Sequence, residues 1–290
     1  MNAQPDPRHD IDGDVHVSPS YLASTTGTGD PALAPLLALG WNLQCDEDPN
    51  VYVSAPDRRV RLGYLPEGED DGLWRINAYT DSFGPPAWGV CFNARVPSEF
   101  VTAFTTALAA AYEQGPDVYL ARPVPGQGER DPFLPLVPLL KQGWEFDRPR
   151  RGVFAAQAPD GLAGLEFATG DLDPAAELTT RDARWQLWAG KSVDRPVWYA
   201  TASTGTPIAL LTAVTQRVAD PAPLPRWRQD TVSYIKGMAQ LTPIPPPSPP
   251  TPTPLDVQRA VASRRPAGLP AVSVPRWSTT SRPALPSPRR

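Results

Sequence analysis

The feature that most constrains the fold of this chain is an internal repeat. The segment Pro35-Leu36-Leu37-Ala38-Leu39-Gly40-Trp41 recurs as Pro138-Leu139-Leu140-Lys141-Gln142-Gly143-Trp144. Further matches pair Val51-Tyr52 with Val153-Phe154, Ala55-Pro56-Asp57 with Ala158-Pro159-Asp160, Trp74 with Trp185, Trp88 with Trp198, and Pro97 with Pro207. The repeat predicts that the 290 residues contain two diverged copies of one domain.

A helix is predicted just before each Gly-Trp pair. Leucines at helical spacing lead up to Gly40, a residue suited to the left-handed position that follows a helix. Trp41 would then contact Leu36, which is the hydrophobic pair of a Schellman cap. Trp144 and Leu139 repeat this arrangement in the second copy.

Alternating apolar residues predict strands after this helix. In the first copy the predicted strands are Val51–Ser54, Arg58–Leu65, Leu73–Tyr79 and Ala87–Phe92. A second helix is predicted from Pro97 to Gly115, and its counterpart from Pro207 to Val218. The fold class is therefore α+β: two tandem α-β-β-β-β-α domains, each an antiparallel sheet covered by helices.

Composition separates the C-terminal region from the repeats. Of the 39 prolines, 14 lie in the last 50 residues, which also hold seven arginines against one aspartate. This region therefore carries about +6, and the preceding 240 residues about −10. The predicted organisation is a disordered leader (1–14), the first domain (15–122), a linker (123–129), the second domain (130–228), a short helix (229–242) and a disordered Pro/Arg-rich tail (243–290).

Residues 15 to 228 resemble a known domain family. The resemblance lies in Val51-Tyr52-Val53-Ser54-Ala55-Pro56-Asp57-Arg58-Arg59-Val60-Arg61-Leu62-Gly63-Tyr64, in the Gly-Trp pairs and in Phe83-Gly84-Pro85-Pro86-Ala87-Trp88. These segments are similar to the streptomycete family named for a Ser-Pro-Asp-Tyr motif, domain of unknown function 317. Here Ala55 separates Ser54 from Pro56, and Arg58 stands where the tyrosine would be. The resemblance implies two tandem copies and an actinobacterial origin, and it implies no catalytic residue.

The sequence predicts neither a catalytic constellation nor a cofactor or metal site. The two histidines, His9 and His16, lie in or beside the leader, outside the repeated cores. Cys45 and Cys91 do not have the spacing of zinc ligands or of a disulfide framework, which favours a reducing compartment. No signal peptide or membrane-spanning segment is recognised, so a cytoplasmic protein is expected.

The candidate binding residues surround the Pro-Asp turn of the first copy. Arg59 and Arg61 alternate with apolar residues, so they are predicted to project from the exposed face of the sheet, with Asp57 and Arg58 at the turn. Such a group suits phosphate or an acidic partner, and a merely solvated surface is the alternative. The candidates are therefore Asp57, Arg58, Arg59 and Arg61.

Three functional hypotheses follow. The first is a non-catalytic interaction protein, in which two modules in contact with each other present open sheet faces, or the groove between them, to a protein partner. The second is nucleic-acid binding through Arg58, Arg59, Arg61 and the basic tail, which the acidic balance of residues 1–240 opposes. The third is an enzyme whose carboxylates converge from distant segments.

Overall fold

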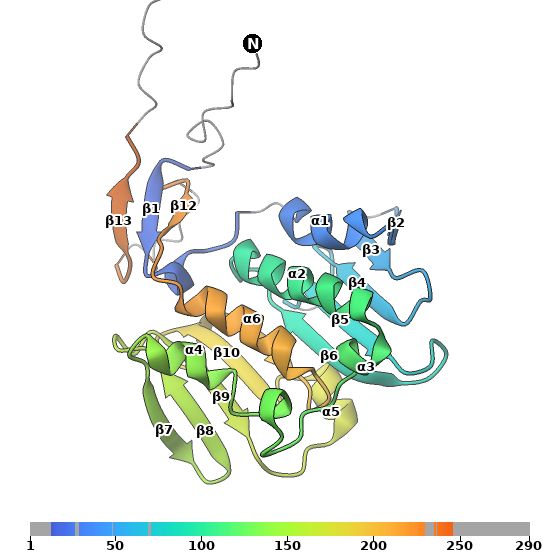
Figure 1. Ribbon diagram of the computed structural model, residues 1–290. Helices are drawn as coiled ribbons and strands as arrows, with labels where there is room; N and C mark the ends of the chain where they lie inside the picture. Colours follow the sequence, from blue (N-terminus) through green and yellow to red (C-terminus); the bar gives the residue numbers. More distant parts are fainter. Residues whose placement is uncertain are drawn as a thin grey trace, which may run out of the picture. The chain divides into compact units, whose positions relative to one another are not determined.

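A ten-stranded antiparallel sheet formed by both repeats is the centre of the computed structural model (Figure 1). The strand order is β2-β3-β4-β5-β6-β11-β10-β9-β8-β7, so the first repeat supplies one half and the second repeat the other. The structure describes residues 13–26, 29–47, 49–68, 71–229, 235 and 237–245. The predicted leader up to residue 12 and the predicted tail from residue 246 lie outside the described residues.

The elements follow the chain in three groups. The first repeat contains α1 (Asp30–Ala38), β2 (Asn42–Cys45), β3 (Val51–Ser54), β4 (Val60–Tyr64), β5 (Trp74–Tyr79), β6 (Pro86–Phe92) and α2 (Ser98–Gln114), and α3 (Pro116–Tyr119) leads from it into the second repeat. The second contains η2 (Gly128–Arg130), α4 (Leu136–Lys141), β7 (Glu145–Arg150), β8 (Val153–Gln157), β9 (Ala163–Ala168), α5 (Pro174–Thr179), β10 (Trp185–Gly190), β11 (Pro196–Ala202) and α6 (Ile208–Ala219). A separate small sheet is formed by β12 (Leu224–Arg226), β1 (Val15–Ser18) and β13 (Gln240–Pro243), and η1 (Ser20–Leu22) follows β1.

The α+β class with antiparallel strands is confirmed, but the predicted α-β-β-β-β-α order is incomplete. Each repeat has a fifth strand directly after its Gly-Trp pair, β2 in the first and β7 in the second. All residues of both strands are exposed, so they do not show the alternation that identified the other strands. The second repeat also inserts α5 between β9 and β10.

The expectation of a separate sheet in each repeat is wrong, because β6 and β11 pair across the boundary between the repeats. Their register places Cys91 opposite Thr201, two positions that correspond when Trp88 is matched with Trp198. An antiparallel pair centred on equivalent residues is related by a local two-fold axis. The axis passes between β6 and β11, and we call it the pseudo-dyad.

Both predicted Schellman caps are confirmed. Gly40 has φ +73° and Gly143 has φ +82°, the left-handed conformation that glycine adopts without steric cost. The amide of Trp41 donates to the carbonyl of Leu36 at 3.4 Å, and the amide of Trp144 donates to the carbonyl of Leu139 at 3.2 Å. Each helix therefore ends with the same turn, which leads directly into the additional strand.

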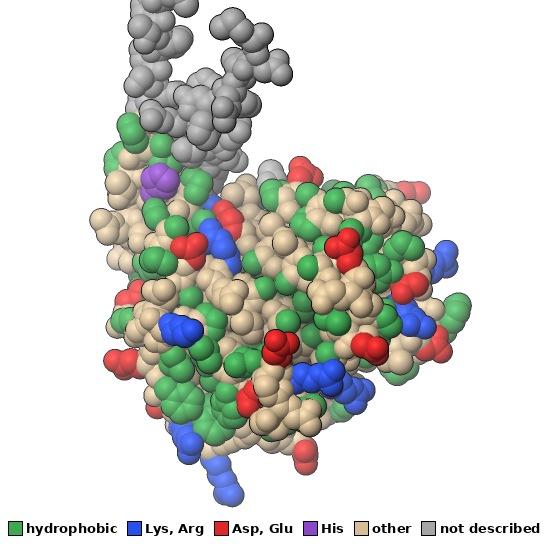
Figure 2. Space-filling model, viewed as in Figure 1, with side chains coloured by type: hydrophobic (Ala, Val, Ile, Leu, Met, Phe, Trp, Pro, Cys, Tyr) green, Lys and Arg blue, Asp and Glu red, His purple; other side chains and the backbone are tan. Residues whose placement is uncertain are grey.

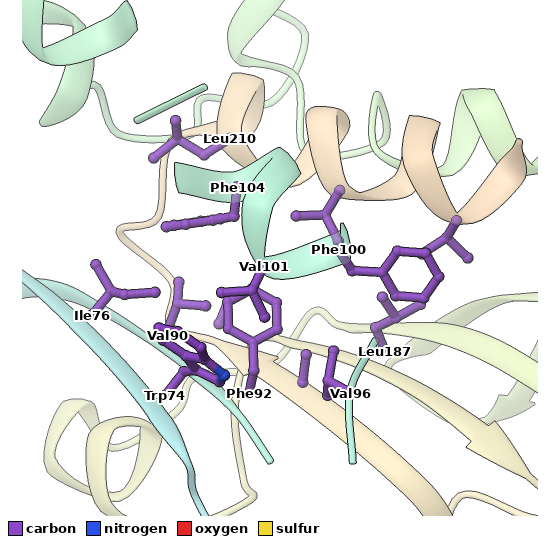
Figure 3. Packing of buried hydrophobic residues seen from close by; sticks show 14 of the residues in the cluster. Trp74, Ile76, Val90, Phe92, Val96, Phe100, Val101, Phe104, Leu187 and Leu210 are labelled. Atoms are coloured by element: carbon purple, nitrogen blue, oxygen red, sulfur yellow. The ribbon is translucent and has the colours of Figure 1, made fainter. Parts of the chain in front are cut away.

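The hydrophobic core lies between the sheet and a layer of helices on one of its faces (Figure 1). The repeated tryptophans are all buried: Trp41, Trp74, Trp88, Trp144, Trp185 and Trp198. The Phe104 ring of α2 packs against the Phe92 ring of β6 with centroids 5.7 Å apart, whereas Figure 3 shows Phe100 of the same helix on the side of Leu187 of β10. On the side shown in Figure 2, acidic and basic side chains are interspersed among apolar ones, without a large patch of one sign.

Of the predicted short helix (229–242), residues 230–234 and 236 lie outside the described residues, and Gln240–Pro243 forms the strand β13. This strand pairs with β1 in an antiparallel arrangement. The segments before the first repeat and after the second are thereby joined. The predicted boundaries of the two domains remain predictions.

Candidate binding face

The Pro-Asp turn is built in the same way in both repeats. Asp57 accepts a hydrogen bond from the amide of Arg59 at 3.0 Å, and Asp160 accepts one from the amide of Leu162 at 2.9 Å. The residue after each aspartate has a positive φ, +58° in Arg58 and +69° in Gly161. The two turns are therefore equivalent, with Asp57 matching Asp160. If the same offset is applied to the strand before each turn, Val51 matches Phe154, and the pairing of Val51 with Val153 given by the sequence is wrong by one residue.

A tyrosine completes each of these turns, and it comes from outside the repeat that it completes. The Tyr21 hydroxyl donates to Asp160 at 2.8 Å, and its carbonyl accepts from Trp198 Nε1 at 2.8 Å. Tyr119 makes the same pair of bonds with Asp57, at 3.5 Å, and with Trp88, at 2.8 Å. Each tyrosine precedes one repeat in the chain and docks into the other.

The signal for this exchange is present in the sequence. Tyr21-Leu22-Ala23 recurs as Tyr119-Leu120-Ala121, and these tripeptides precede the two Gly-Trp helices. Each copy of the repeat therefore begins at this tripeptide, before the Pro-Leu-Leu and Gly-Trp residues by which the repeat was recognised.

The tyrosines predict a loss of stability at alkaline pH. Burial raises the pKa of Tyr21 and Tyr119, and the carboxylates of Asp160 and Asp57 raise them further. Unfolded tyrosine has a pKa of about 10. Since the folded pKa is higher, the stabilisation is complete below about pH 10 and is lost as the pH rises toward the folded pKa. We expect the urea midpoint to fall less steeply above about pH 10 in Tyr21→Phe than in the wild type, and parallel curves would contradict this.

The four candidate residues are divided between the two sides of the sheet. Asp57 and Arg59 lie by Tyr119 on the helix-covered side, where both influence the pKa of its hydroxyl. Arg58 and Arg61 lie on the opposite face. The expected alternation fails at Arg59 because β4 begins only at Val60, so Arg59 still belongs to the turn.

Arg58 and Arg61 line a groove on the face opposite the helices. A third arginine, Arg75, joins them from β5, and the groove has a volume of about 540 Å³. The described residues that line it are Asn42, Gln44, Tyr52, Val53, Ser54, Arg58, Arg61, Leu62, Gly63, Leu65, Arg75, Asn77 and Tyr79, none of which is a carboxylate. We call this the basic groove. Arg75 alternates with the buried Trp74 and Ile76, so the rule that predicted the orientation of Arg61 could also have placed Arg75 on the exposed face of its own strand.

One of the groove arginines is held in place by its neighbours. A guanidinium nitrogen of Arg61 donates to the Ser82 carbonyl at 2.6 Å, and the guanidinium lies 4.5 Å from the centre of the Tyr79 ring. Both contacts limit the conformations of a long side chain, so less entropy is lost when a ligand binds to it.

A second cavity adjoins the basic groove at the pseudo-dyad. This dyad pocket has a volume of about 230 Å³ and a lining drawn from β5, β6, β11, α5 and the segment before β5. On one wall, the carboxylate of Asp71 accepts hydrogen bonds from Tyr199 at 2.5 Å and from Arg181 at 2.9 Å. Burial, and then this bond to Asp71, raise the pKa of the Tyr199 hydroxyl above its usual value of about 10.

Within the described residues, no group of three or more His, Cys, Asp or Glu side chains is arranged to hold a metal ion. His16 lies on β1, in the small sheet, whereas His9 lies outside the described residues. In the part of the chain that the structure describes, no helix has the length and apolar character needed to cross a membrane.

These observations define a tandem-repeat α+β protein in which one face of the sheet bears a basic groove and a polar pocket. Residues 54–113 and 157–224 match the model of the SPDY domain, a domain of unknown function (DUF317). Each repeat therefore contains a segment that matches this family model, consistent with the two copies that the sequence resemblance implied. No curated protein and no solved structure matches the chain significantly.

Proposed function

We propose that this chain is a non-catalytic binding protein whose basic groove receives an acidic segment of a partner protein. The observation that supports the proposal is the convergence of Arg58, Arg61 and Arg75 on one groove without a carboxylate in its described lining. Residues 1–240 carry about −10 in total, so an acidic partner is repelled by much of the remaining surface. Attraction in one place and repulsion elsewhere together give specificity.

The groove suits a peptide better than a nucleic acid. Arg61 lies against the Tyr79 ring, and the Tyr52 hydroxyl donates to Asp46 at 3.2 Å, so both aromatic residues already have a role within the protein. Single-stranded nucleic acid would need exposed aromatic side chains on which its bases could stack. It would also bring many phosphates to an acidic protein, whereas a short acidic peptide brings only a few charges.

Charge reversal in the groove tests the proposal. A labelled glutamate-rich peptide should bind the full chain, and the double variant Arg61→Glu, Arg75→Glu should raise the dissociation constant by roughly 100-fold, through loss of two favourable contacts and gain of two repulsive ones. Arg130→Glu is the matched control, because Arg130 is exposed in η2 and does not line the groove. Fluorescence anisotropy at several salt concentrations measures the effect.

The same measurements can reject the proposal. Equal weakening by the groove and control variants would show that only net charge matters. The proposal would also fail if a single-stranded oligonucleotide bound more tightly than the peptide and lost affinity when Arg61 and Arg75 were replaced. That result would show that the groove binds nucleic acid and not an acidic peptide. Saturable turnover of a substrate by the purified chain would overturn the non-catalytic assignment.

A further inference from the structure

The basic groove leads into the dyad pocket. Arg75 and Asn77 line both cavities, so a ligand lying along the groove reaches the pocket without leaving the surface of the sheet. Both side chains project from β5 on the face opposite α2, the same face that α5 partly covers. The two cavities therefore form one continuous path from the outer strands to the pseudo-dyad.

Helix α5 bounds this path. Leu178 packs directly over Gly89: a Cβ atom added at Gly89 would lie 2.5 Å from Leu178 Cδ2. The same Cβ atom would lie 2.6 Å from Asn77 Oδ1, so a larger side chain fits there only if the side chains of Leu178 and Asn77 move. Residues from Glu177 to Arg181 line one side of the pocket, and Asp71 and Tyr199 also contribute to its wall. An extended chain that entered from the groove would meet this obstruction at the pseudo-dyad.

The interior of the pocket offers hydrogen-bond donors to an anion. Arg75 has five N–H donors in a fork that matches a carboxylate, and Asn77 and Thr201 add an amide and a hydroxyl. Two carboxylates also belong to the lining, but both already accept hydrogen bonds within the protein. Asp71 is bonded to Tyr199 and Arg181, and Glu177 accepts from the amide and hydroxyl of Thr204 at 3.0 and 2.6 Å.

We infer that the dyad pocket receives the C-terminal carboxylate of the acidic partner segment. The inference rests on the proposed function and deepens it: the basic groove binds acidic side chains, and the pocket binds the end of the chain. A C-terminus fits because it needs no space beyond its carboxylate, whereas a continuing chain would have to displace α5. Preference for a free terminus would restrict the partners to proteins that end in an acidic segment.

The test compares three labelled peptides of the same glutamate-rich sequence on the full-length chain. The first has a free C-terminus, the second a C-terminal amide, and the third an amide plus one additional internal glutamate. The third peptide restores the net charge of the first, so it separates recognition of the terminus from general attraction. We expect the free acid to bind at least 10-fold more tightly than both amides.

A pocket variant strengthens the test. Thr201→Val, which removes one hydroxyl with little change in volume, should reduce the preference for the free terminus and leave the affinity for the amides unchanged. Equal affinity of the three peptides for the wild-type chain would overturn the pocket assignment, while groove-dependent binding of all three would leave the proposed function intact. Absence of groove-dependent binding would overturn both.

Discussion

Replacing Tyr21 with alanine is expected to lower the free energy of unfolding by about 4 kcal/mol, the cost typical of removing a large buried aromatic side chain. Tyr21 is 7% exposed, and its ring meets that of Trp144 edge-on with centroids 5.6 Å apart. Its hydroxyl also satisfies Asp160. The substitution therefore leaves a cavity and removes a hydrogen bond to a charged group, and both effects destabilise the second repeat.

Two variants separate the contributions to this effect. Tyr21→Phe keeps the ring and should cost only about 1.5 to 3 kcal/mol, the value for a hydrogen bond to a charged partner. Tyr119→Ala is the counterpart on the other side of the pseudo-dyad and should cost about as much as Tyr21→Ala, since Tyr119 is also buried. Urea unfolding measures all three. A cost below about 1 kcal/mol for Tyr21→Ala would contradict the structural role of the exchanged tyrosines.

Local patterns in the sequence were sufficient for much of the architecture. The Gly-Trp pairs predicted both helix ends, because a Schellman cap depends on residues only five positions apart, such as Leu36 and Trp41. The tryptophans that recur in both copies are buried, as expected for a large apolar residue that is present in both repeats and requires a matching interior. Helix α2 likewise follows from its apolar positions and from the glycine after Gln114.

The missed features depend on contacts between distant residues. Strand β2 is stabilised by backbone pairing with β3, and backbone pairing does not require an apolar side-chain pattern. The single sheet depends on β6 pairing with β11, which joins residues more than 100 positions apart, such as Cys91 and Thr201. The exchange of Tyr21 and Tyr119 between repeats is non-local in the same way.

The candidate site shows the same division between local and distant information. Alternation along β4 correctly placed Arg61 on the face away from the helices, since Val60 and Leu62 are buried. It could not show that Arg75 lies on the same groove, which requires knowledge that β4 and β5 pair in register. The dyad pocket was also beyond prediction, because its lining combines both repeats with α5.

The segment that contains Tyr21 is also anchored by a buried ion pair that joins both ends of the folded region. Arg226, on β12, forms a two-point ion pair with Glu99 at the start of α2, with distances of 2.8 and 2.7 Å. Its Nε also donates to the carbonyl of Ser24. The Arg226 side chain is 4% exposed, and that of Glu99 is 26% exposed. The guanidinium of Arg226 therefore connects three parts of the chain: the segment after Tyr21, helix α2 of the first repeat, and β12, which follows the second repeat.

Removal of Arg226 alone should therefore be costly. Arg226→Ala is expected to lower the free energy of unfolding by about 3 to 5 kcal/mol, because it leaves the partly buried Glu99 carboxylate without its counter-ion. The matched control is Arg217→Ala, which breaks the ion pair between Arg217 and Asp220. Because these two side chains are more exposed, at 25% and 43%, this substitution should lower the free energy of unfolding by less than about 1 kcal/mol. Urea unfolding of both variants gives the comparison.

A double substitution distinguishes the cost of an unpaired charge from the value of the contact itself. If the loss in Arg226→Ala comes mainly from the uncompensated carboxylate, Arg226→Met combined with Glu99→Leu should recover most of the lost stability, since apolar groups of similar size replace both charges. If the double variant remains as unstable as Arg226→Ala, the hydrogen bond from Arg226 to Ser24 would account for the loss. In that case Tyr21→Ala and Arg226→Ala should be non-additive, because both would release the same segment from the second repeat.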